Sequence, residues 1–199
     1  TALSIGGWTY GQYNAAVNLP TAETVFGEES SYVFEYSDSV NGKWTTSVPV
    51  NAGTHYVRLT VAGTKNYNGF VSEPVSFEIQ KATLAAPQLT LNETNTSFTG
   101  SELQSVVSGF DSAVMGLEYD GNSKVLGSNV TVSALNAGEY TVKFILKDKT
   151  NYHWADGVQT DENGNAVRGW TVARMKVARP KANGKNYVVN GKTLVYIPA

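Results

Sequence analysis

The feature that most constrains this chain is a phrase that it contains twice. The segments "NAGTHYVRLTVAGTKNY" and "NAGEYTVKFILKDKTNY" begin at Asn51 and Asn136, and each ends on an Asn-Tyr pair. The distance from the first Asn to the Asn of that pair is 15 residues in both copies (66 − 51 and 151 − 136). Glycines at Gly11, Gly100 and Gly191 repeat with spacings of 89 and 91 residues. A period of about ninety residues predicts tandem repeats.

The period divides the chain into two repeats and part of a third. We predict a first β-domain over residues 1–82 and a second over 83–180, with a boundary near Gln80–Gln88, where strand-like alternation stops. Residues 181–199 are predicted to be the first hairpin of a truncated third repeat, with Asn190-Gly191 as its turn. Both ends of the sequence are therefore expected to be cut from a longer chain.

Apolar and polar residues alternate in short segments, which is typical of half-buried strands. These segments are Tyr32–Tyr36, Tyr56–Val61 and Val75–Ile79 in the first repeat, and Met115–Tyr119, Tyr140–Leu146 and Trp170–Val177 in the second. The pairs Asn41-Gly42, Asp120-Gly121 and Asn163-Gly164 predict tight hairpins between strands. The longest helix candidate is the short stretch "TAETVFGEE" after Pro20. The predicted class is all-β, as small immunoglobulin-like β-sandwiches or, alternatively, β-grasp-like domains.

The alternation also predicts which residues of the repeated phrase face the core. The inward residues are expected to be Val57, Leu59 and Val61 in the first copy, and Val142, Phe144 and Leu146 in the second. Arg58, Lys143 and Lys147 are expected to point outward.

The two ends of the phrase are predicted to be turns. Asn51 and Asn136 can hydrogen-bond their own backbone two residues on, and the glycine that follows allows an unusual backbone conformation. Tyr56 and Tyr140 are expected to begin the core strands. Asn66 and Asn151 then turn the chain, while Tyr67 and Tyr152 cover the end of their own core. In this interpretation the phrase is architectural.

Composition excludes several functional classes. Net charge is −2 without a basic block, so nucleic acid and anionic membranes are not expected partners. No apolar run approaches the ~20 residues that span a bilayer, so no membrane insertion is expected. The absence of cysteine excludes disulfides, thiol catalysis and cysteine-based zinc sites.

Catalytic and metal-binding patterns are weak. His55 and His153 are interpreted as ordinary strand or turn residues, and no sequence motif of a protease, a nucleotide-binding loop or a dinucleotide-binding fold occurs. The acidic pairs Glu28-Glu29 and Asp161-Glu162 are interpreted as solvated loop charges. Calcium binding through Asp156, Asp161 and Glu162 is a weaker alternative, because the ligand spacing of a calcium loop is missing. We therefore expect neither an enzyme nor a cofactor.

Aromatic side chains are the most interesting candidates for binding. Of Trp8, Trp44, Trp154 and Trp170, the last alternates with Val172 and is expected in the core. Trp44 follows a predicted hairpin and Trp154 lies in a predicted loop, so these two are the candidate ligand-binding aromatics. The alternative is that these rings cap the ends of a small core. The triplets Asn92, Asn95 and Asn129 match the glycosylation pattern but mainly mark exposed loops.

At these landmarks the chain resembles MBG domains, the repeat modules of large bacterial surface proteins, and in particular their YGX type. The matching marks are "TYG" at Thr9–Gly11, the Asn-Ala-Gly strand and Asn-Tyr pair in both copies, and a closing "F.I" at Phe77 and Ile79. The second repeat resembles a related variety, with "TG…L" at its start and with "NYHWADG" and "GWTV". These marks together cover almost the whole chain.

The resemblance implies a non-enzymatic stalk or adhesive module, extracellular or on a bacterial cell surface. It implies a host or cell-wall glycan or protein as partner, and we expect the fragment itself to be a monomer. The alternative function is a carbohydrate-binding module of a secreted glycan-degrading enzyme. Surface proteins of this kind sometimes carry a Lys–Asn amide crosslink beside a buried acid. Here its candidate residues are Lys143 or Lys147, Asn136 or Asn151, and Glu118.

Overall fold

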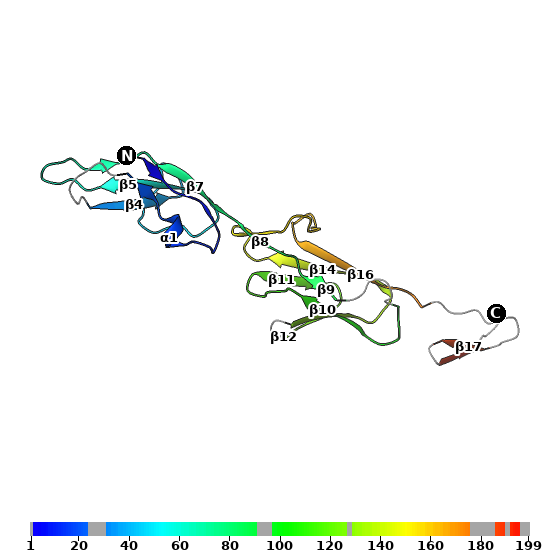
Figure 1. Ribbon diagram of the computed structural model, residues 1–199. Coiled ribbons are helices and arrows are strands. Elements are labelled where there is room, and N and C mark those ends of the chain that lie inside the picture. The colour runs from blue at the N-terminus through cyan, green and yellow to red at the C-terminus, as the bar shows by residue number, and fades with distance from the viewer. Residues whose placement is uncertain are drawn as a thin grey trace. The chain divides into compact units, whose positions relative to one another are not determined.

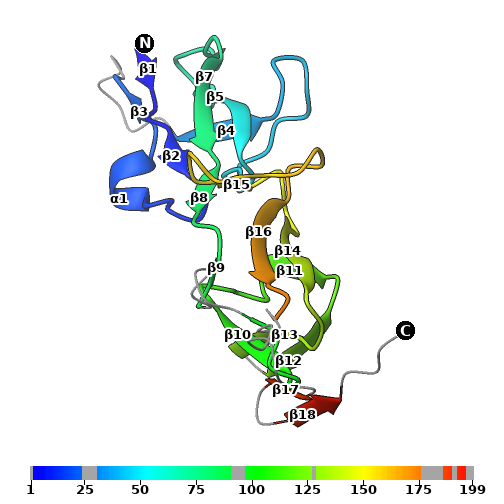
Figure 2. The ribbon, with the colours of Figure 1, turned by 90° about the vertical axis from the view of Figure 1, so that its right-hand side faces the viewer.

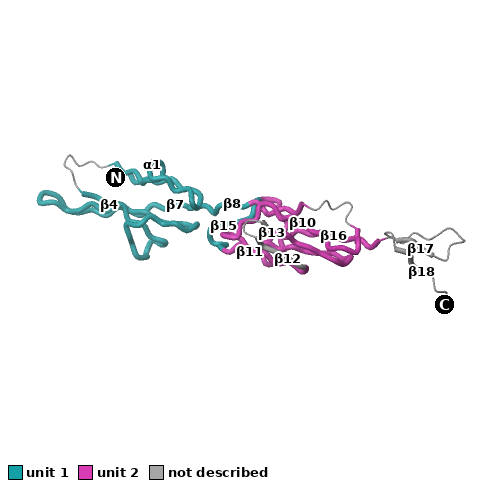
Figure 3. Tube along the Cα trace, turned by 90° about the horizontal axis from the view of Figure 1, so that it is seen from below, with its two compact units in different colours: residues 1–84, 148–155 teal, residues 85–147, 156–199 magenta. Residues whose placement is uncertain are grey.

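The computed structural model of the chain describes residues 2–23, 31–90, 97–126, 129–175, 186–189 and 192–195. By their internal contacts the residues form two compact units, 1–84 with 148–155 and 85–147 with 156–199 (Figure 3). The predicted all-β class is confirmed, since nearly all regular structure is strand (Figure 1). In the described ranges, no helix has the length and apolar character needed to cross a membrane.

The first unit is built on one sheet. Its strand order is β2 (Trp8–Thr9), β7 (Val75–Gln80), β5 (Gly53–Val61) and β4 (Tyr32–Ser37), and β6 (Phe70–Val71) also pairs with β5 (Figure 2). The β2–β7 pair is parallel and the other pairs are antiparallel. The long strand β5 therefore lies between β4 and the closing strand β7, and β2, near the start of the repeat, pairs with the other edge of β7.

Smaller elements complete the first unit. Strand β1 (Leu3–Ser4) pairs with β3 (Thr21–Ala22), and β8 (Ala82–Leu84) pairs in parallel with β15 (Tyr152–Trp154). The helix α1 (Ala15–Asn18) begins where Asn14 Oδ1 accepts a hydrogen bond from the Ala16 amide at 3.0 Å, as an N-cap does.

Most of the predicted helix candidate lies outside the described residues. The segment "TAETVFGEE" starts as strand β3, and its residues from 24 on lie outside the described residues. Helix α1 precedes it, and it is a single short turn with Val17 74% exposed.

The register predicted for β5 is confirmed. Val57, Leu59 and Val61 are buried, while Arg58 is on the opposite face, where it pairs with Glu35 of β4. Tyr36 lies opposite Val57 and packs with it in one buried cluster that also contains Trp8, Phe77 and Ile79. The Trp8 ring stacks on Phe77 with centroids 5.2 Å apart. Alternation along the strand thus builds the core of the first unit.

The second unit is a two-sheet sandwich. One sheet has the order β12 (Asn122–Leu126), β13 (Asn129–Ala134), β10 (Leu103–Ser108) and β9 (Gln88–Leu89). The other has the order β11 (Met115–Tyr119), β14 (Gly138–Leu146) and β16 (Ala166–Val172). Ala134 of the first sheet packs in one buried cluster with Trp170 and Val172 of the second. Trp170 is a core residue, as predicted.

Strand β14 has the same place in its sheet as β5, next to the closing strand. Val142, Phe144 and Leu146 are buried, as predicted. Gly138 pairs with Val172 on β16 just as Gly53 pairs with Ile79 on β7. In this alignment Tyr140 corresponds to His55. Tyr56 and Tyr140 were predicted to begin the core strands, but β5 and β14 begin earlier, at Gly53 and Gly138, and Tyr56 is on the face opposite the core.

The three dipeptides that predicted hairpin turns differ in what they form in the structure. Asn163-Gly164 forms a tight turn, in which Gly164 N donates to Asp161 O at 3.0 Å. Asn41-Gly42 lies in the loop closed by the Tyr36–Thr45 bridge. Asp120-Gly121 is not a hairpin, because β11 before it and β12 after it belong to different sheets. The dipeptide there marks a corner at which the chain changes sheet.

The last described residues form a hairpin. Strand β17 (Asn186–Val189) pairs antiparallel with β18 (Lys192–Val195), which agrees with the predicted two-stranded ribbon. The turn residues Asn190 and Gly191, and also Tyr196, lie outside the described residues. The assignment of residues 181–199 to a third repeat stays a prediction, as do the limits of the two domains.

Phe144 gives a direct test of the core. It is fully buried and lies beside Phe110, with ring centroids 6.2 Å apart. Phe144→Ala is expected to lower the free energy of unfolding by about 3–5 kcal/mol, because it removes a large apolar side chain and leaves a cavity. Urea unfolding measures this loss. Ile145→Ala, a change to the next residue on the opposite face, is the control; an equal loss there would contradict the register.

Candidate functional site

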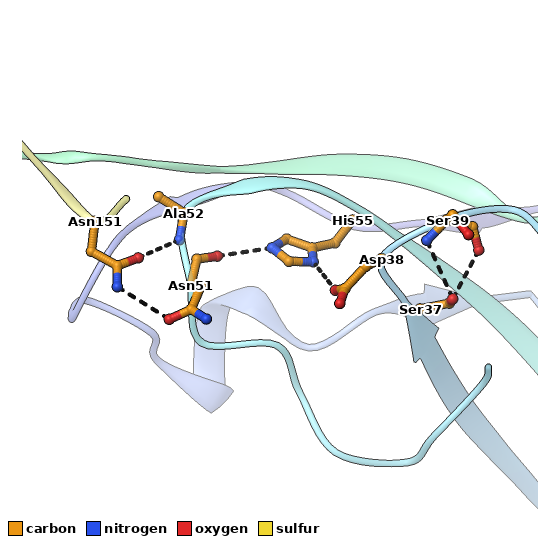
Figure 4. A network of polar contacts seen from close by, with 7 residues as sticks. All are labelled: Ser37, Asp38, Ser39, Asn51, Ala52, His55 and Asn151. Atoms are coloured by element: carbon orange, nitrogen blue, oxygen red, sulfur yellow. Dashed lines mark hydrogen bonds and ion pairs between the residues drawn. The ribbon is translucent and has the colours of Figure 1, made fainter. Parts of the chain in front are cut away.

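The candidate site is the turn at Asn51–Gly53, which begins β5 and carries the first half of the repeated phrase. Gly53 has φ +142°, a backbone conformation that residues with a side chain rarely adopt. The turn leaves the Asn51 carbonyl, the Asn51 side chain and the Ala52 amide to be satisfied by other residues. Figure 4 shows how two side chains, those of His55 and Asn151, do so.

His55 satisfies the turn from within β5. The ring is buried, its Nε2 is 2.8 Å from the Asn51 carbonyl oxygen, and its Nδ1 is 2.9 Å from Asp38 Oδ1 (Figure 4). Each ring nitrogen thus lies at hydrogen-bond distance from an oxygen of the same unit. His55 is therefore a structural link between the turn and the loop that follows β4.

The contacts of His55 also decide whether it can form a catalytic triad with Ser37 and Asp38. Ser37 lies close to this network, but its hydroxyl donates to the Ser39 carbonyl at 2.8 Å (Figure 4). A serine nucleophile needs a histidine nitrogen free to accept its proton. His55 Nε2 lies 2.8 Å from the Asn51 carbonyl instead of facing Ser37, so Ser37, His55 and Asp38 lack the serine–histidine contact of a catalytic triad.

Asn151 satisfies the turn from the other side. Its Oδ1 accepts a hydrogen bond from the Ala52 amide at 2.7 Å, and its Nδ2 donates to Asn51 Oδ1 at 3.1 Å (Figure 4). Nδ2 also donates to Asp148 Oδ2 at 2.7 Å. Asn151 is only 4% exposed. Its amide thus uses one acceptor and two donors, and it belongs to the Asn-Tyr pair of the second copy of the phrase.

Asp148 holds Asn151 in position. Its Oδ1 accepts from the amides of Thr150 and Asn151, both at 3.1 Å. The hydrogen bond from the Asn151 side chain, with those from the two amides, holds the pKa of Asp148 below its ordinary value. Asp148 therefore fixes the orientation of the Asn151 side-chain amide that binds the turn.

The rest of the segment Asp148–Ala155 is also part of the first unit. Strand β15 pairs with β8, the Ala82 amide donates to the Asn151 carbonyl, and the Ala155 amide donates to the Leu84 carbonyl, both at 2.8 Å. The Tyr152 ring packs edge-on against Tyr10 with centroids 5.3 Å apart. The prediction that Tyr152 covers the core of its own repeat was wrong. We name this segment, bound to the Asn51–Gly53 turn, the clasp.

His153 is paired with a side chain of the neighbouring strand. It lies in β15, it is exposed, and its Nε2 is 2.8 Å from Thr83 Oγ1. This is a pair of side chains on neighbouring strands, as the sequence interpretation of His153 anticipated.

The two candidate aromatics differ in environment. Trp44 is half-buried, and the Arg58 guanidinium carbon is 4.4 Å from its ring centroid. Trp154 was expected to be exposed in a loop, but it lies in β15 and is only 9% exposed. Burial removes the free ring face that stacking on a sugar requires, so of the two only Trp44 keeps the accessibility expected of a ligand-binding ring.

Arg58 is held on the sheet face beside Trp44. Its Nε donates to Glu35 Oε2 at 2.8 Å, and Thr60 Oγ1 donates to the same oxygen at 2.7 Å. The Thr60 hydrogen bond, together with Arg58, holds the pKa of Glu35 below its ordinary value. The result is a ring, a cation and a carboxylate side by side on the face of the first unit opposite the core.

The residues proposed for an amide crosslink are engaged elsewhere. Lys143 Nζ is 3.3 Å from Asp161 Oδ2, and Lys147 Nζ donates to the Ser112 carbonyl. Asn151 belongs to the clasp, and Glu118 is exposed rather than a buried acid. The contacts that such a crosslink requires are therefore missing for these residues.

The acidic loop suggested for calcium is organised by its own amides. Asp161 Oδ1 accepts from the backbone amides of Asn163 and Asn165, at 3.0 and 2.9 Å, and Asn165 Nδ2 is 3.2 Å from Asp161 Oδ2. Within the described ranges, no three acidic, histidine or cysteine side chains gather to hold a metal. Asp161 is thus a turn-forming residue in this structure.

Two comparisons with known proteins found no related protein or family. A search against models of protein families found no match, and neither did a search of curated proteins. The resemblance to MBG-type repeats therefore rests on the residues and spacings quoted above.

The clasp makes a prediction about stability. Asn151→Ala leaves the Ala52 amide without its partner, so it is expected to lower the free energy of unfolding of the first unit by about 1–3 kcal/mol. Urea unfolding and hydrogen exchange at Ala52 measure the effect. The matched control is Asn66→Ala, which changes the equivalent but exposed Asn of the first copy and should stay within about 0.5 kcal/mol of wild type. Equal effects of the two changes would contradict the role of the clasp.

Asp161 makes a prediction about pH. The Asn165 amide above all, with the Asn165 side chain, Lys143 and the Asn163 amide, lowers the pKa of Asp161 to about 2. A carboxyl with a lowered folded-state pKa stabilises the fold above its ordinary pKa, and this contribution is lost as pH falls through the folded value. Stability of the second unit should therefore fall between about pH 4 and pH 2, and less so in Asp161→Asn. Unfolding midpoints across this range test it, with the exposed Asp156→Asn as control.

Proposed function

We propose that this chain is a non-enzymatic structural repeat module of a bacterial cell-surface or secreted protein, working outside the cell as a stalk or binding unit. The tandem phrase and the resemblance to MBG-type repeats support the class and the location. A stalk needs units that repeat along the chain and contacts that fasten one part of the chain to another.

The observation that carries the proposal is the clasp. The Asn-Tyr pair of the second copy is used to complete the Asn51–Gly53 turn of the first unit, through Asn151 and Tyr152. The residues that make the phrase recognisable thus satisfy backbone groups and pack rings. In a catalytic module the recognisable residues would instead present reactive groups to a cavity.

The histidine contacts agree with a non-enzymatic role. Both ring nitrogens of His55 lie at hydrogen-bond distance from oxygens of its own unit, and His153 pairs with Thr83 across neighbouring strands. Neither side chain faces an activated serine or a cluster of carboxylates in the described structure. These contacts support structural roles for both residues.

One observation favours the alternative, a carbohydrate-binding module. Trp44 combines a half-exposed ring with the neighbouring Arg58 and Glu35, and sugar binding uses an aromatic platform flanked by hydrogen-bonding groups. Arg58 covers part of the ring, however, so a sugar would have to use the remaining surface or displace the guanidinium.

Glycan-array binding separates the two functions. For a structural module we expect no glycan binding that depends on Trp44. Binding that is lost in Trp44→Ala and kept in Tyr67→Ala, a control at another exposed aromatic, would favour the carbohydrate-binding function. Trp154→Ala is not informative, because that ring is buried. Turnover of any substrate by the purified chain would overturn both functions.

A further inference from the structure

The loop that joins β4 to β5 borders a hollow beside the Asn51–Gly53 turn. Two adjoining cavities make up this hollow, one of about 400 Å³ and one of about 260 Å³, and both are open to solvent. Asp38 and Pro49 line both cavities. The larger cavity is within the range of about 300–1,000 Å³ that is usual for small-molecule sites in proteins. We name the two cavities together the loop hollow.

Asp38 is held in place and is still accessible. Its Oδ1 lies 2.9 Å from Nδ1 of the buried His55 (Figure 4), and its side chain is 88% exposed. In the described part of the chain, Asp38 Oδ2 has no hydrogen-bond or ion-pair partner. One oxygen thus orients the carboxylate, while the other can accept a hydrogen bond from a ligand. A group that is oriented in advance lowers the cost of binding.

Lys43 supplies the opposite charge. It lines the smaller cavity and is exposed. Among the residues that the structure describes, its ammonium has no ion pair, so Asp38 and Lys43 do not neutralise each other. An ammonium only donates hydrogen bonds and a carboxylate only accepts them. A ligand that satisfies both groups therefore has donors for Asp38 and an acceptor, preferably anionic, for Lys43.

The remaining wall of the loop hollow combines hydroxyl groups with apolar surface. Thr45, Ser47 and Thr54 are exposed lining residues, and their hydroxyls have no partner among the described residues. Val50, which is 68% exposed, and Pro49 add apolar surface. A saturated ring with hydroxyl groups around its edge and C–H groups on its faces matches this mixture. A pyranose sugar has this structure.

We propose that the loop hollow is a binding site for a carboxylated sugar, such as a uronic acid residue of a glycan. Ring hydroxyls donate to Asp38, the sugar carboxylate accepts from Lys43, and the apolar face of the ring packs on Pro49 and Val50. A neutral sugar leaves Lys43 unused, whereas acetate leaves Asp38 unused. A free amino acid matches both charges but has neither the ring nor the hydroxyls that the wall would bind.

This assignment rests on the proposed function, because a binding unit outside the cell is exposed to glycans, and it names the class of the ligand. Trp44 lines neither cavity. The loop hollow is therefore separate from the face that carries Trp44 and Arg58, and sugar binding in it is not expected to depend on the Trp44 ring.

Binding of a single sugar residue is expected to be weak. The loop hollow is open, and one sugar makes few contacts to offset the freedom that it loses on binding. A titration that reaches high ligand concentrations measures such binding directly.

The test is an NMR titration of the isotope-labelled full chain with sodium glucuronate. We expect saturable shifts of the Ser47, Val50 and Thr54 amide signals. Glucose, sodium acetate and glycine are added in separate titrations at the same concentrations and ionic strength. Each lacks part of the chemistry that the loop hollow would recognise, so each is expected to shift these signals several-fold less.

Two variants assign the contacts. Lys43→Gln removes the charge that binds the carboxylate, so it should reduce the response to glucuronate to the level of glucose. Asp38→Asn keeps an oxygen opposite His55 but removes the carboxylate, so it should weaken glucuronate binding several-fold. The matched control is Lys65→Gln, which changes an exposed lysine in another loop of the same unit and should bind as wild type does. Amide signals remote from the loop hollow check that each variant is folded.

Three results would overturn the proposal. They are the absence of glucuronate shifts, equal shifts with glucose, acetate or glycine, and an equal loss of binding in Lys43→Gln and Lys65→Gln. Any of them leaves the proposed function standing, since a structural module needs no ligand and is tested separately by the turnover assay. Turnover of a substrate would instead overturn the proposed function.

Discussion

The first unit depends on one buried side-chain amide. The Ala52 amide at the start of the central strand has no backbone partner in the turn, and a buried N–H without a partner is costly. Asn151 supplies the acceptor and returns two donors, one to Asn51 and one to Asp148. Asn suits this place because a carboxylate would lack the donors, whereas an ammonium would lack the acceptor. The pairing of β15 with β8 holds the Asn151 side chain next to the turn.

In both turns the carbonyl of the Asn is hydrogen-bonded by a side chain, although the residue that provides this side chain differs. A buried His55 donates to the Asn51 carbonyl, and Tyr140 donates to the Asn136 carbonyl from the same position in the phrase. The requirement is a donor four residues after the Asn, which imidazole and phenol both meet. The surroundings differ accordingly: His55 has Asp38 as a second acceptor, whereas Tyr140 packs against Trp170 with ring centroids 5.3 Å apart.

The sequence predicted features that depend on neighbouring residues, and it missed contacts between residues that are far apart in the chain. The alternation in the two long strands gave the correct buried faces, because period-two patterning is a property of each strand alone. Asp120-Gly121 was taken for a hairpin, since a turn dipeptide specifies the local backbone and not the sheet that the next strand joins. The clasp was missed because Asn51 and Asn151 are 100 residues apart, and no local pattern marks their contact. Trp154 was misplaced for the same reason, since its burial comes from the pairing of β15 with β8.

The clasp gives a structural use to the Asn-Ala-Gly turn of the first copy and to the Asn-Tyr pair of the second. A turn and an Asn-Tyr pair at opposite ends of one strand form a contact with direction: the turn of one repeat receives the pair of the next. Such head-to-tail contacts do not close on themselves unless the rotation between copies permits a ring. Each added repeat uses one turn and provides another, so the interaction places no limit on the number of units.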